Sequence, residues 1–281
     1  MKRVLSVQDL SCVGRCSLTV AMPVISAMGC QCAVLPTAVL STHTAFPAPF
    51  VRSLTEDMAS ISEHWKRIGA EFDVISIGYL SDPAQAEAAA KLTEDFGGFV
   101  VLDPVMGDNG TLYSRITGEH IRAMSALVQR AQLLLPNVTE AAALAGMEYR
   151  QTEDIGYYRA LASRLLELGC GSAVITGATL APEKTGFFGI DREGREFSYQ
   201  TRRIPKSFHG TGDLFSAVIT GGLATGLDTE NAARLAASFV EKCISGTREV
   251  TPWGVEFERQ LPWLWQKLQA SPGCGCGCPG F

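Results

Sequence analysis

Residues 208–217 read FHGTGDLFSA, and this stretch is the most informative part of the sequence. Two glycines, Gly210 and Gly212, stand just before Asp213, which leads directly into the apolar run Leu214–Leu223. Glycines permit a tight turn that exposes several backbone N–H groups. Such groups at the start of a helix form a site for a phosphate or for developing negative charge. The stretch therefore predicts a glycine turn that opens an apolar helix and binds an anion.

Asp213 favours a chemical interpretation of this turn. A carboxylate at this point would repel a phosphate unless its task is to accept a proton from an attacking hydroxyl group. An anion-binding turn with an aspartate base is the equipment for phosphoryl transfer to an alcohol. The alternative is an ordinary glycine turn in which Asp213 only caps the helix, because aspartate is a favoured capping residue.

Upstream of this turn, short apolar runs alternate with amphipathic runs. The apolar runs are typical of strands buried on both faces, and they are Val4–Val7, Cys32–Val39, Val74–Tyr79, Phe99–Leu102, Leu133–Pro136 and Ala173–Thr176. The amphipathic runs predict helices over Leu54–Ile68, Asp82–Phe96, Glu119–Arg130 and Thr152–Leu168. This alternation predicts an α/β fold: a three-layer sandwich with a mostly parallel central sheet flanked by helices. Two later runs, Gly186–Ile190 and Arg195–Thr201, predict an antiparallel hairpin.

The composition excludes several classes of protein. The chain has 281 residues, of which 46% are hydrophobic and 19% charged, which is typical of a globular protein. Its net charge of −5 and the lack of a basic run argue against nucleic-acid binding. We find no secretory leader and no apolar stretch long enough for a membrane helix, so we expect a cytoplasmic protein with no membrane partner.

One domain over residues 1–270 is expected, because no linker divides this part of the chain. Residues 271–281 read SPGCGCGCPGF, a low-complexity tail that we expect to be disordered. Its alternating cysteines leave a metal-handling role open as a separate hypothesis.

Acidic side chains also follow two of the predicted strands. Asp103 and Asp108 lie in DPVMGD directly after the run Phe99–Leu102, and Asn137 and Glu140 follow the next run in PNVTE. The carboxyl ends of strands are where open α/β sheets bind ligands, and carboxylates there suit Mg²⁺ held largely through water and phosphate oxygens. Asn137 and Glu140 also fit a plain capping box, an alternative that stays open.

Taken together, these motifs resemble the ribokinase-like superfamily and, within it, the pyridoxal kinase family. The resemblance runs from Val4 to about Ala270. It is carried by GTGD at 210–213, DPVMGD at 103–108, PNxxE at 136–140, the STHT stretch at 41–44, GYL at 78–80 and the N-terminal Val7-Gln8 with Gly14. It implies a kinase that uses ATP and Mg²⁺ to phosphorylate the 5′-hydroxymethyl group of pyridoxal, pyridoxine or pyridoxamine. It also implies a homodimer, and it leaves a monovalent cation requirement open.

The resemblance implies a role for each matching residue. Asp213 would be the base, and Gly210, Thr211 and Gly212 would stabilise the transferring phosphoryl group. Asp108 and Glu140 would organise Mg²⁺. Asp103, Asn137 and Thr176 would lie near ATP. The vitamin pocket would be lined by Asp9, Thr37, His43 and Tyr79, with Thr37 bonded to a ring substituent and the Tyr79 ring beside the pyridine.

One departure from the family pattern affects the substrate. Pyridoxal kinases usually have serine at the position of Asp9, and aspartate there is more like the hydroxymethylpyrimidine kinases of thiamine synthesis. That kinase activity is the first alternative, and a preference for pyridoxamine is another interpretation of the same residue. A non-catalytic carrier of pyridoxal is the alternative from a different class, although a carrier has no need of the base in GTGD.

Overall fold

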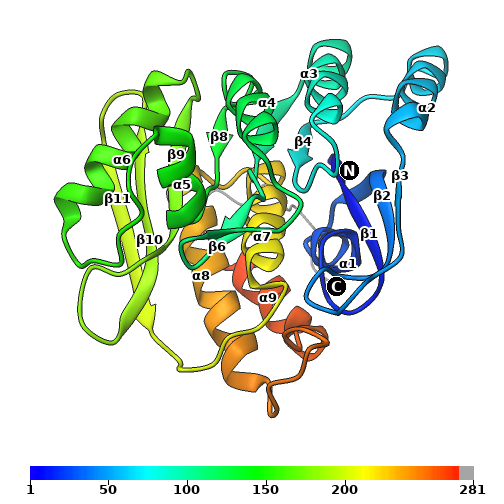
Figure 1. Cartoon of the computed structure of the whole chain (residues 1–281). Helices are drawn as coiled ribbons and strands as arrows, with labels where there is room; N and C mark the ends of the chain where they lie inside the picture. Colours follow the sequence, from blue (N-terminus) through cyan, green and yellow to red (C-terminus); the bar gives the residue numbers. More distant parts are fainter. Residues whose placement is uncertain (272–281) are drawn as a thin grey trace.

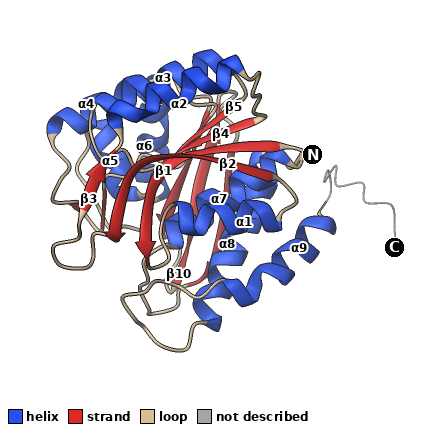
Figure 2. Ribbon diagram, turned by 90° about the vertical axis from the view of Figure 1, so that its right-hand side faces the viewer, coloured by secondary structure: helices blue, strands red, loops and turns tan. Residues whose placement is uncertain are grey.

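The computed structural model describes residues 1–271 and contains one large sheet covered by helices on both faces (Figures 1 and 2). The sheet order is β11-β10-β9-β8-β5-β4-β1-β2-β3. The six central strands, β9-β8-β5-β4-β1-β2 in sheet order, pair in parallel. The outer strands β3, β10 and β11 pair with their neighbours in antiparallel fashion. This confirms the expected three-layer α/β sandwich with a mostly parallel sheet. The expected disorder of the tail, apart from Ser271, lies outside the described residues.

The strands of this sheet are β1 (Arg3–Val13), β2 (Gln31–Thr42), β3 (Val51–Ser53), β4 (Val74–Ile77), β5 (Phe99–Leu102), β8 (Leu133–Leu134), β9 (Ser172–Ala178), β10 (Lys184–Asp191) and β11 (Glu196–Arg202). A separate two-stranded hairpin consists of β6 (Gly107–Asp108) and β7 (Thr111–Leu112). Each predicted strand is present, and the predicted hairpin is β10 with β11. The first two strands extend further than their apolar runs, since β1 continues into the polar residues that approach the site.

Two apolar cores lie on opposite faces of the sheet. Figure 2 shows the helix layers that cover these two faces. One core lies under α2 (Thr55–Arg67), α3 (Ala84–Phe96), α4 (Gly118–Val128), α5 (Val138–Ala145) and α6 (Ile155–Glu167). The other lies under α1 (Leu18–Ala27), α7 (Thr211–Ala224), α8 (Thr229–Gly246) and α9 (Leu261–Gln269), with a short 3-10 turn at Glu258–Gln260. The central strands contribute side chains to both cores, so they consist of nearly continuous apolar runs.

A break in strand register lies at the centre of the carboxyl edge of the sheet. Gln8 of β1 pairs with Pro36 of β2, but Leu10 pairs with Val39, so β2 contains one extra residue there. Proline cannot donate a ladder hydrogen bond, which makes a bulge at this point favourable. Bulges re-aim nearby side chains and are frequent beside active sites. Here the bulge lies next to Asp9 and Thr37.

Candidate active site

The glycine turn begins α7 as the sequence predicts. Gly210 has φ +83° and is the residue before the first helical turn. The carbonyl oxygen of Arg15 occupies the space that a Cβ of residue 210 would need, so only glycine fits. The first N–H groups of a helix have no acceptor within the helix. Those of Thr211, Gly212 and Asp213 therefore present a positive helix end at the carboxyl edge of the sheet.

Asp213 lies in this first turn and faces other acidic groups. Burial raises the pKa of its carboxyl group to about 6, and the nearby charge of Asp9 adds to the increase. The main-chain N–H of Ser17 and the thiol of Cys16 donate to the carboxylate and act in the opposite direction. A carboxyl group with this pKa is ionised at neutral pH and is still basic enough to take a proton from an alcohol in a transition state.

Asp9 lies in β1 beside the register break, and its side chain is 3% exposed. Two hydroxyl groups hold its carboxylate: Ser17 Oγ donates to Oδ1 at 2.5 Å, and Ser11 Oγ donates to Oδ2 at 2.9 Å. Burial raises the pKa of Asp9, and these hydroxyl donors partly offset the increase. A buried carboxylate held only by neutral donors favours a ligand that brings a donor or a positive charge.

Tyr79 follows β4 and lies close enough to Asp9 for the carboxylate charge to raise the pKa of its phenol, although burial is the larger cause. Thr37 is completely buried, and its hydroxyl donates to the carbonyl oxygen of Tyr79 at 2.8 Å. This bond uses the one hydrogen of the Thr37 hydroxyl and leaves its oxygen as an acceptor, so the expected contact with a ring substituent stays a prediction. Thr37 also fixes the backbone that carries the Tyr79 ring.

His43 follows β2 and is enclosed by rings. Its ring centroid is 4.7 Å from that of His209 and 4.9 Å from that of Phe46. The carbonyl oxygen of Pro252 lies 2.8 Å from His43 Nε2 and can only accept, so Nε2 carries the hydrogen. Nδ1 is buried without a hydrogen-bond partner in the described structure. His43 is close enough to Asp9 to lower the pKa of the Asp9 carboxyl group.

Asp103 follows β5 and lies between the two halves of the site. Burial raises its pKa well above the usual value, with Glu140 and Asp213 adding to the increase, while a hydrogen bond with the Ser216 side chain opposes it. The ATP-side carboxylate expected from the sequence and the base expected from GTGD therefore lie close together, although 110 positions separate them in the chain.

Asn137 and Glu140 form the capping box at the start of α5. The Asn137 side chain accepts the N–H groups of residues 139 and 140 and donates to the carbonyl oxygen of Gly107 at 2.7 Å. Glu140 Oε2 accepts the Asn137 N–H, and Oε1 accepts that of Met106 at 2.9 Å. These contacts fasten the DPVMGD segment to α5, so the capping interpretation is confirmed. Burial raises the pKa of Glu140 to about 7.

Asp108 and Thr176 are the remaining residues that the sequence predicts near Mg²⁺ and ATP. Asp108 is exposed in β6, where its carboxylate accepts from the backbone and side chain of Asn109 at 2.8 and 3.0 Å. Thr176 in β9 pairs with Asn137 in an isolated parallel bridge. Residues 1–271 contain no preformed group of three metal-ligating side chains. Exposed Asp108 and neighbouring Glu140 offer carboxylate oxygens, which fits Mg²⁺ held mainly by water and phosphate oxygens.

Sequence reasoning missed Ser17 and Tyr113 and discounted Cys16. Tyr113 follows β7, and burial together with the charges of Glu140, Asp108, Asp213 and Asp103 raises the pKa of its phenol. Tyr113 therefore lies near all four of these acidic groups. Ser17 and Cys16 directly precede α1 and contact the two carboxylates described above. No motif marks these three residues, since only the packing of α1 and β7 against the sheet edge brings them to the site.

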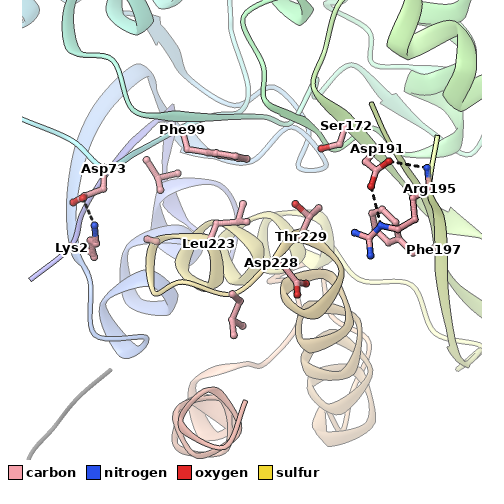
Figure 3. A pocket seen from close by; sticks show the side chains of 13 residues that line it. Lys2, Asp73, Phe99, Ser172, Asp191, Arg195, Phe197, Leu223, Asp228 and Thr229 are labelled. Carbon is pink, nitrogen blue, oxygen red and sulfur yellow. Dashed lines mark hydrogen bonds and ion pairs between the residues drawn. The ribbon is translucent and has the colours of Figure 1, made fainter. Parts of the chain in front are cut away.

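A cavity of about 470 Å³ lies away from the candidate active site (Figure 3). It is lined by residues at the amino ends of strands, such as Lys2, Phe99 and Ser172, together with Leu223 and Thr229 from α7 and α8. The acidic groups described above follow the carboxyl ends of the strands. This cavity therefore lies at the opposite edge of the sheet from the candidate active site.

No helix within residues 1–271 is long and apolar enough to span a membrane. The model of the family described as phosphomethylpyrimidine kinase matches residues 21–255. A pyridoxine/pyridoxal/pyridoxamine kinase of Bordetella bronchiseptica is 28% identical over 259 residues, which cover 88% of this chain and 89% of that protein.

Two solved structures match nearly the whole chain. A pyridoxal kinase of Lactobacillus plantarum aligns with a TM-score of 0.89 and 32% identity, covering 96% of this chain and 99% of that one. A protein of Bacteroides thetaiotaomicron crystallised with pyridoxal aligns with a TM-score of 0.88 and 33% identity, covering 95% and 96%.

Proposed function

The chain belongs to the phosphomethylpyrimidine kinase family, in the ribokinase-like superfamily, and from this membership we propose that it is an ATP-dependent pyridoxal kinase. It transfers a phosphoryl group to the 5′-hydroxymethyl group of pyridoxal, pyridoxine or pyridoxamine. The observation that carries this proposal is the placement of Asp213 in the first turn of α7, where a base with a pKa of about 6 lies beside the N–H groups of an anion-binding helix end.

In this mechanism the substrate lies between Asp9 and Asp213. Asp9, His43 and Tyr79 orient the ring, and Thr37 acts through Tyr79. Asp213 accepts the proton of the hydroxymethyl group as the hydroxymethyl oxygen attacks the γ-phosphorus; the bond from this phosphorus to the bridging oxygen breaks, and ADP leaves. The N–H groups of Gly210, Thr211 and Gly212 stabilise the negative charge on the transferring phosphoryl group.

The ATP side is formed by residues after β5, β8 and β9. Asp103, Asn137 and Thr176 lie near the nucleotide in this proposal. Mg²⁺, when bound, neutralises charge on the phosphates, and Asp108 and Glu140 would hold it through its water ligands. Glu140 also keeps DPVMGD fixed on α5, so one residue serves both the structure and the metal.

The wider assignments rest on the resemblance and on the sequence. We propose a single kinase domain over residues 1–270, a homodimer and a cytoplasmic location. A monovalent cation requirement is an open part of the proposal, to be tested by replacing potassium with sodium or choline in the assay.

A hydroxymethylpyrimidine kinase is the second candidate. It is favoured by Asp9, a buried carboxylate in the substrate pocket, and by the family model, which takes its description from pyrimidine kinases. Both substrates present a hydroxymethyl group on a nitrogen heteroaromatic ring, so the same base and anion-binding turn serve either reaction.

The test is a coupled ADP-release assay with ATP and Mg²⁺, run in parallel on pyridoxal, pyridoxine, pyridoxamine and hydroxymethylpyrimidine. We expect turnover on the vitamin B6 set, with the highest kcat/KM on one of its members. Turnover only on the pyrimidine assigns the protein to thiamine synthesis. Binding of ATP without turnover on any of the four would show that the substrate pocket is wrongly assigned, and a folded protein that binds no ATP would refute the kinase assignment.

A further inference from the structure

The turn before α1 contains a serine in a conformation that serine rarely adopts. Ser17 has φ +49° and ψ −125°, a region that glycine tolerates and residues with a Cβ avoid. Its side chain is 3% exposed, so solvent does not hold it there. Such a conformation persists only where the surrounding contacts impose it, and it is frequent at functional sites.

Three groups of Ser17 each have a specific partner. Its Oγ donates to Asp9 Oδ1 at 2.5 Å, and its main-chain N–H lies close enough to the Asp213 carboxylate to lower the pKa of that group. Its carbonyl oxygen accepts the N–H groups of Val20 and Ala21 at 3.0 and 2.9 Å, in the first turn of α1. One residue therefore joins the substrate-side carboxylate, the proposed base and the start of a core helix.

The residues around Ser17 fix the same turn against α7. The Arg15 carbonyl oxygen lies directly against Gly210, and the Arg15 N–H donates to the carbonyl oxygen of Trp253 at 2.9 Å. Cys16 Sγ lies 3.5 Å from Ser17 Oγ and also contacts Asp213. The turn at residues 15–17 thus packs against the glycine turn at Gly210. A movement of residue 17 would therefore move the Ser17 N–H and the Cys16 thiol relative to Asp213.

We propose that Ser17 is the positioning residue for the base: its hydroxyl, anchored on Asp9, holds residue 17 in the strained conformation that keeps its N–H on the Asp213 carboxylate. Ser17 does not touch the reacting atoms and acts through Asp213. Through the hydrogen bond from the Ser17 hydroxyl to Asp9, the position of Asp213 depends on a carboxylate of the proposed substrate pocket. This inference rests on the proposed function, which gives Asp213 the role of base.

Three variants separate the effect of the Ser17 hydroxyl from that of the strained backbone conformation of residue 17. Ser17→Ala removes the hydroxyl but keeps a Cβ, so residue 17 relaxes to a negative φ and its N–H leaves Asp213. Ser17→Gly removes the same hydroxyl but tolerates the original conformation. Ser11→Ala is the matched control, because it removes the other hydroxyl donor of Asp9 from a regular strand.

The measurement is kcat and KM for pyridoxal with saturating ATP, on variants shown to be folded by circular dichroism. We expect kcat to fall roughly 30- to 100-fold in Ser17→Ala, since small misplacements of a catalytic group cost about this much. In Ser17→Gly and Ser11→Ala we expect a fall of less than about threefold in kcat, with a raised KM. Equal kcat values for Ser17→Ala and Ser17→Gly would overturn the proposal, whether both fall or neither does.

A second readout does not need activity. The titration of Asp213 is followed by carboxyl ¹³C NMR; the titratable groups that face it are Asp9 from β1, Cys16 from the turn, Asp103 after β5 and Tyr113 after β7. Loss of the Ser17 N–H raises the apparent pKa of Asp213 in Ser17→Ala relative to Ser17→Gly. If the wild-type chain phosphorylates no B6 vitamer, the proposed function fails, and this titration alone decides the positioning: a difference supports it and identical titrations refute it.

Discussion

At the scale of single residues, the site is a group of carboxylates whose pKa values are raised by burial. Asp9, Asp103, Glu140 and Asp213 all show this direction of change. Buried like charges cost stability, and natural proteins retain them mainly where a ligand or reaction needs them. The arrangement is therefore expected of an enzyme that binds MgATP and removes a proton from an alcohol.

Replacing Asp213 with asparagine tests both consequences of its raised pKa. We expect kcat to fall about 10³-fold, within the range for loss of a general base, while the Kd for ATP changes little. In the wild-type enzyme kcat/KM should rise tenfold per pH unit below the Asp213 pKa of about 6 and level off above it. Steady-state kinetics from pH 5 to 8 measure this limb, and a flat profile with full activity of the variant would exclude the base role.

The same substitution should stabilise the folded protein. Because the folded-state pKa of Asp213 lies above its usual value, the ionised carboxylate opposes folding above about pH 6. Asp213→Asn should therefore raise the free energy of unfolding by about 1–3 kcal/mol at pH 7.5. The gain should shrink as the pH falls through 6 towards 4. Urea unfolding of the wild type and the variant at pH 7.5 and near pH 4 measures this difference in the free energy of unfolding and its sign.

At the scale of elements, two segments hold the two halves of the candidate site in place. The capping box of α5 fastens β6 and its flanking residues through Asn137 and Glu140. The turn before α1 fastens the glycine turn through Arg15. In PNxxE, groups that the sequence marks as chemical also carry structural hydrogen bonds, so the functional and the capping interpretations do not exclude each other.

Gly210→Ala tests the fit of the glycine turn, with Gly194→Ala as a matched control. Both glycines have positive φ, +83° and +78°, but only Gly210 has a backbone atom in the space of the new Cβ. Both variants should lose about 1 kcal/mol of stability from backbone strain, and Gly210→Ala should lose more because its Cβ overlaps the Arg15 carbonyl oxygen. Only Gly210→Ala should also lose activity, by at least about 100-fold, as the anion-binding turn is displaced. Similar activity in the two variants would show that Arg15 and Gly210 can separate without harm.

At the scale of the whole molecule, the two edges of the sheet carry different groups. The carboxyl edge carries the acidic groups and the start of α7, as open parallel sheets generally place ligands. The cavity in Figure 3 lies at the amino edge, where Arg195 makes an ion pair with Asp191 at 3.0 Å. Its size alone does not make it the active site.

Arg195→Ala should therefore leave kcat and KM for ATP and for pyridoxal within about twofold. The side chain of Arg195 is 61% exposed, and exposed ion pairs contribute about 0–1 kcal/mol, so stability should change little as well. Thermal unfolding and steady-state kinetics provide the check. A large rise in either KM would link the amino-edge cavity to catalysis and contradict the assignment of the site to the carboxyl edge.

The sequence alone determined the strand and helix alternation, the glycine turn before Asp213 and the order of the strand-end motifs. These are local features: hydrophobic periodicity and turn residues act within a few positions of the chain. The hairpin β10–β11 and the start of α7 could be predicted for this reason.

Only the tertiary structure decided which side chains meet. The bulge between β1 and β2 lies beside both Asp9 and Thr37, and the Thr37 hydroxyl donates to the Tyr79 backbone. Ser17 and Tyr113 reach the site through helix and hairpin packing across long distances in sequence. Burial and long-range contact set hydrogen-bond partners and pKa values, and neither can be derived from a residue's neighbours in the chain.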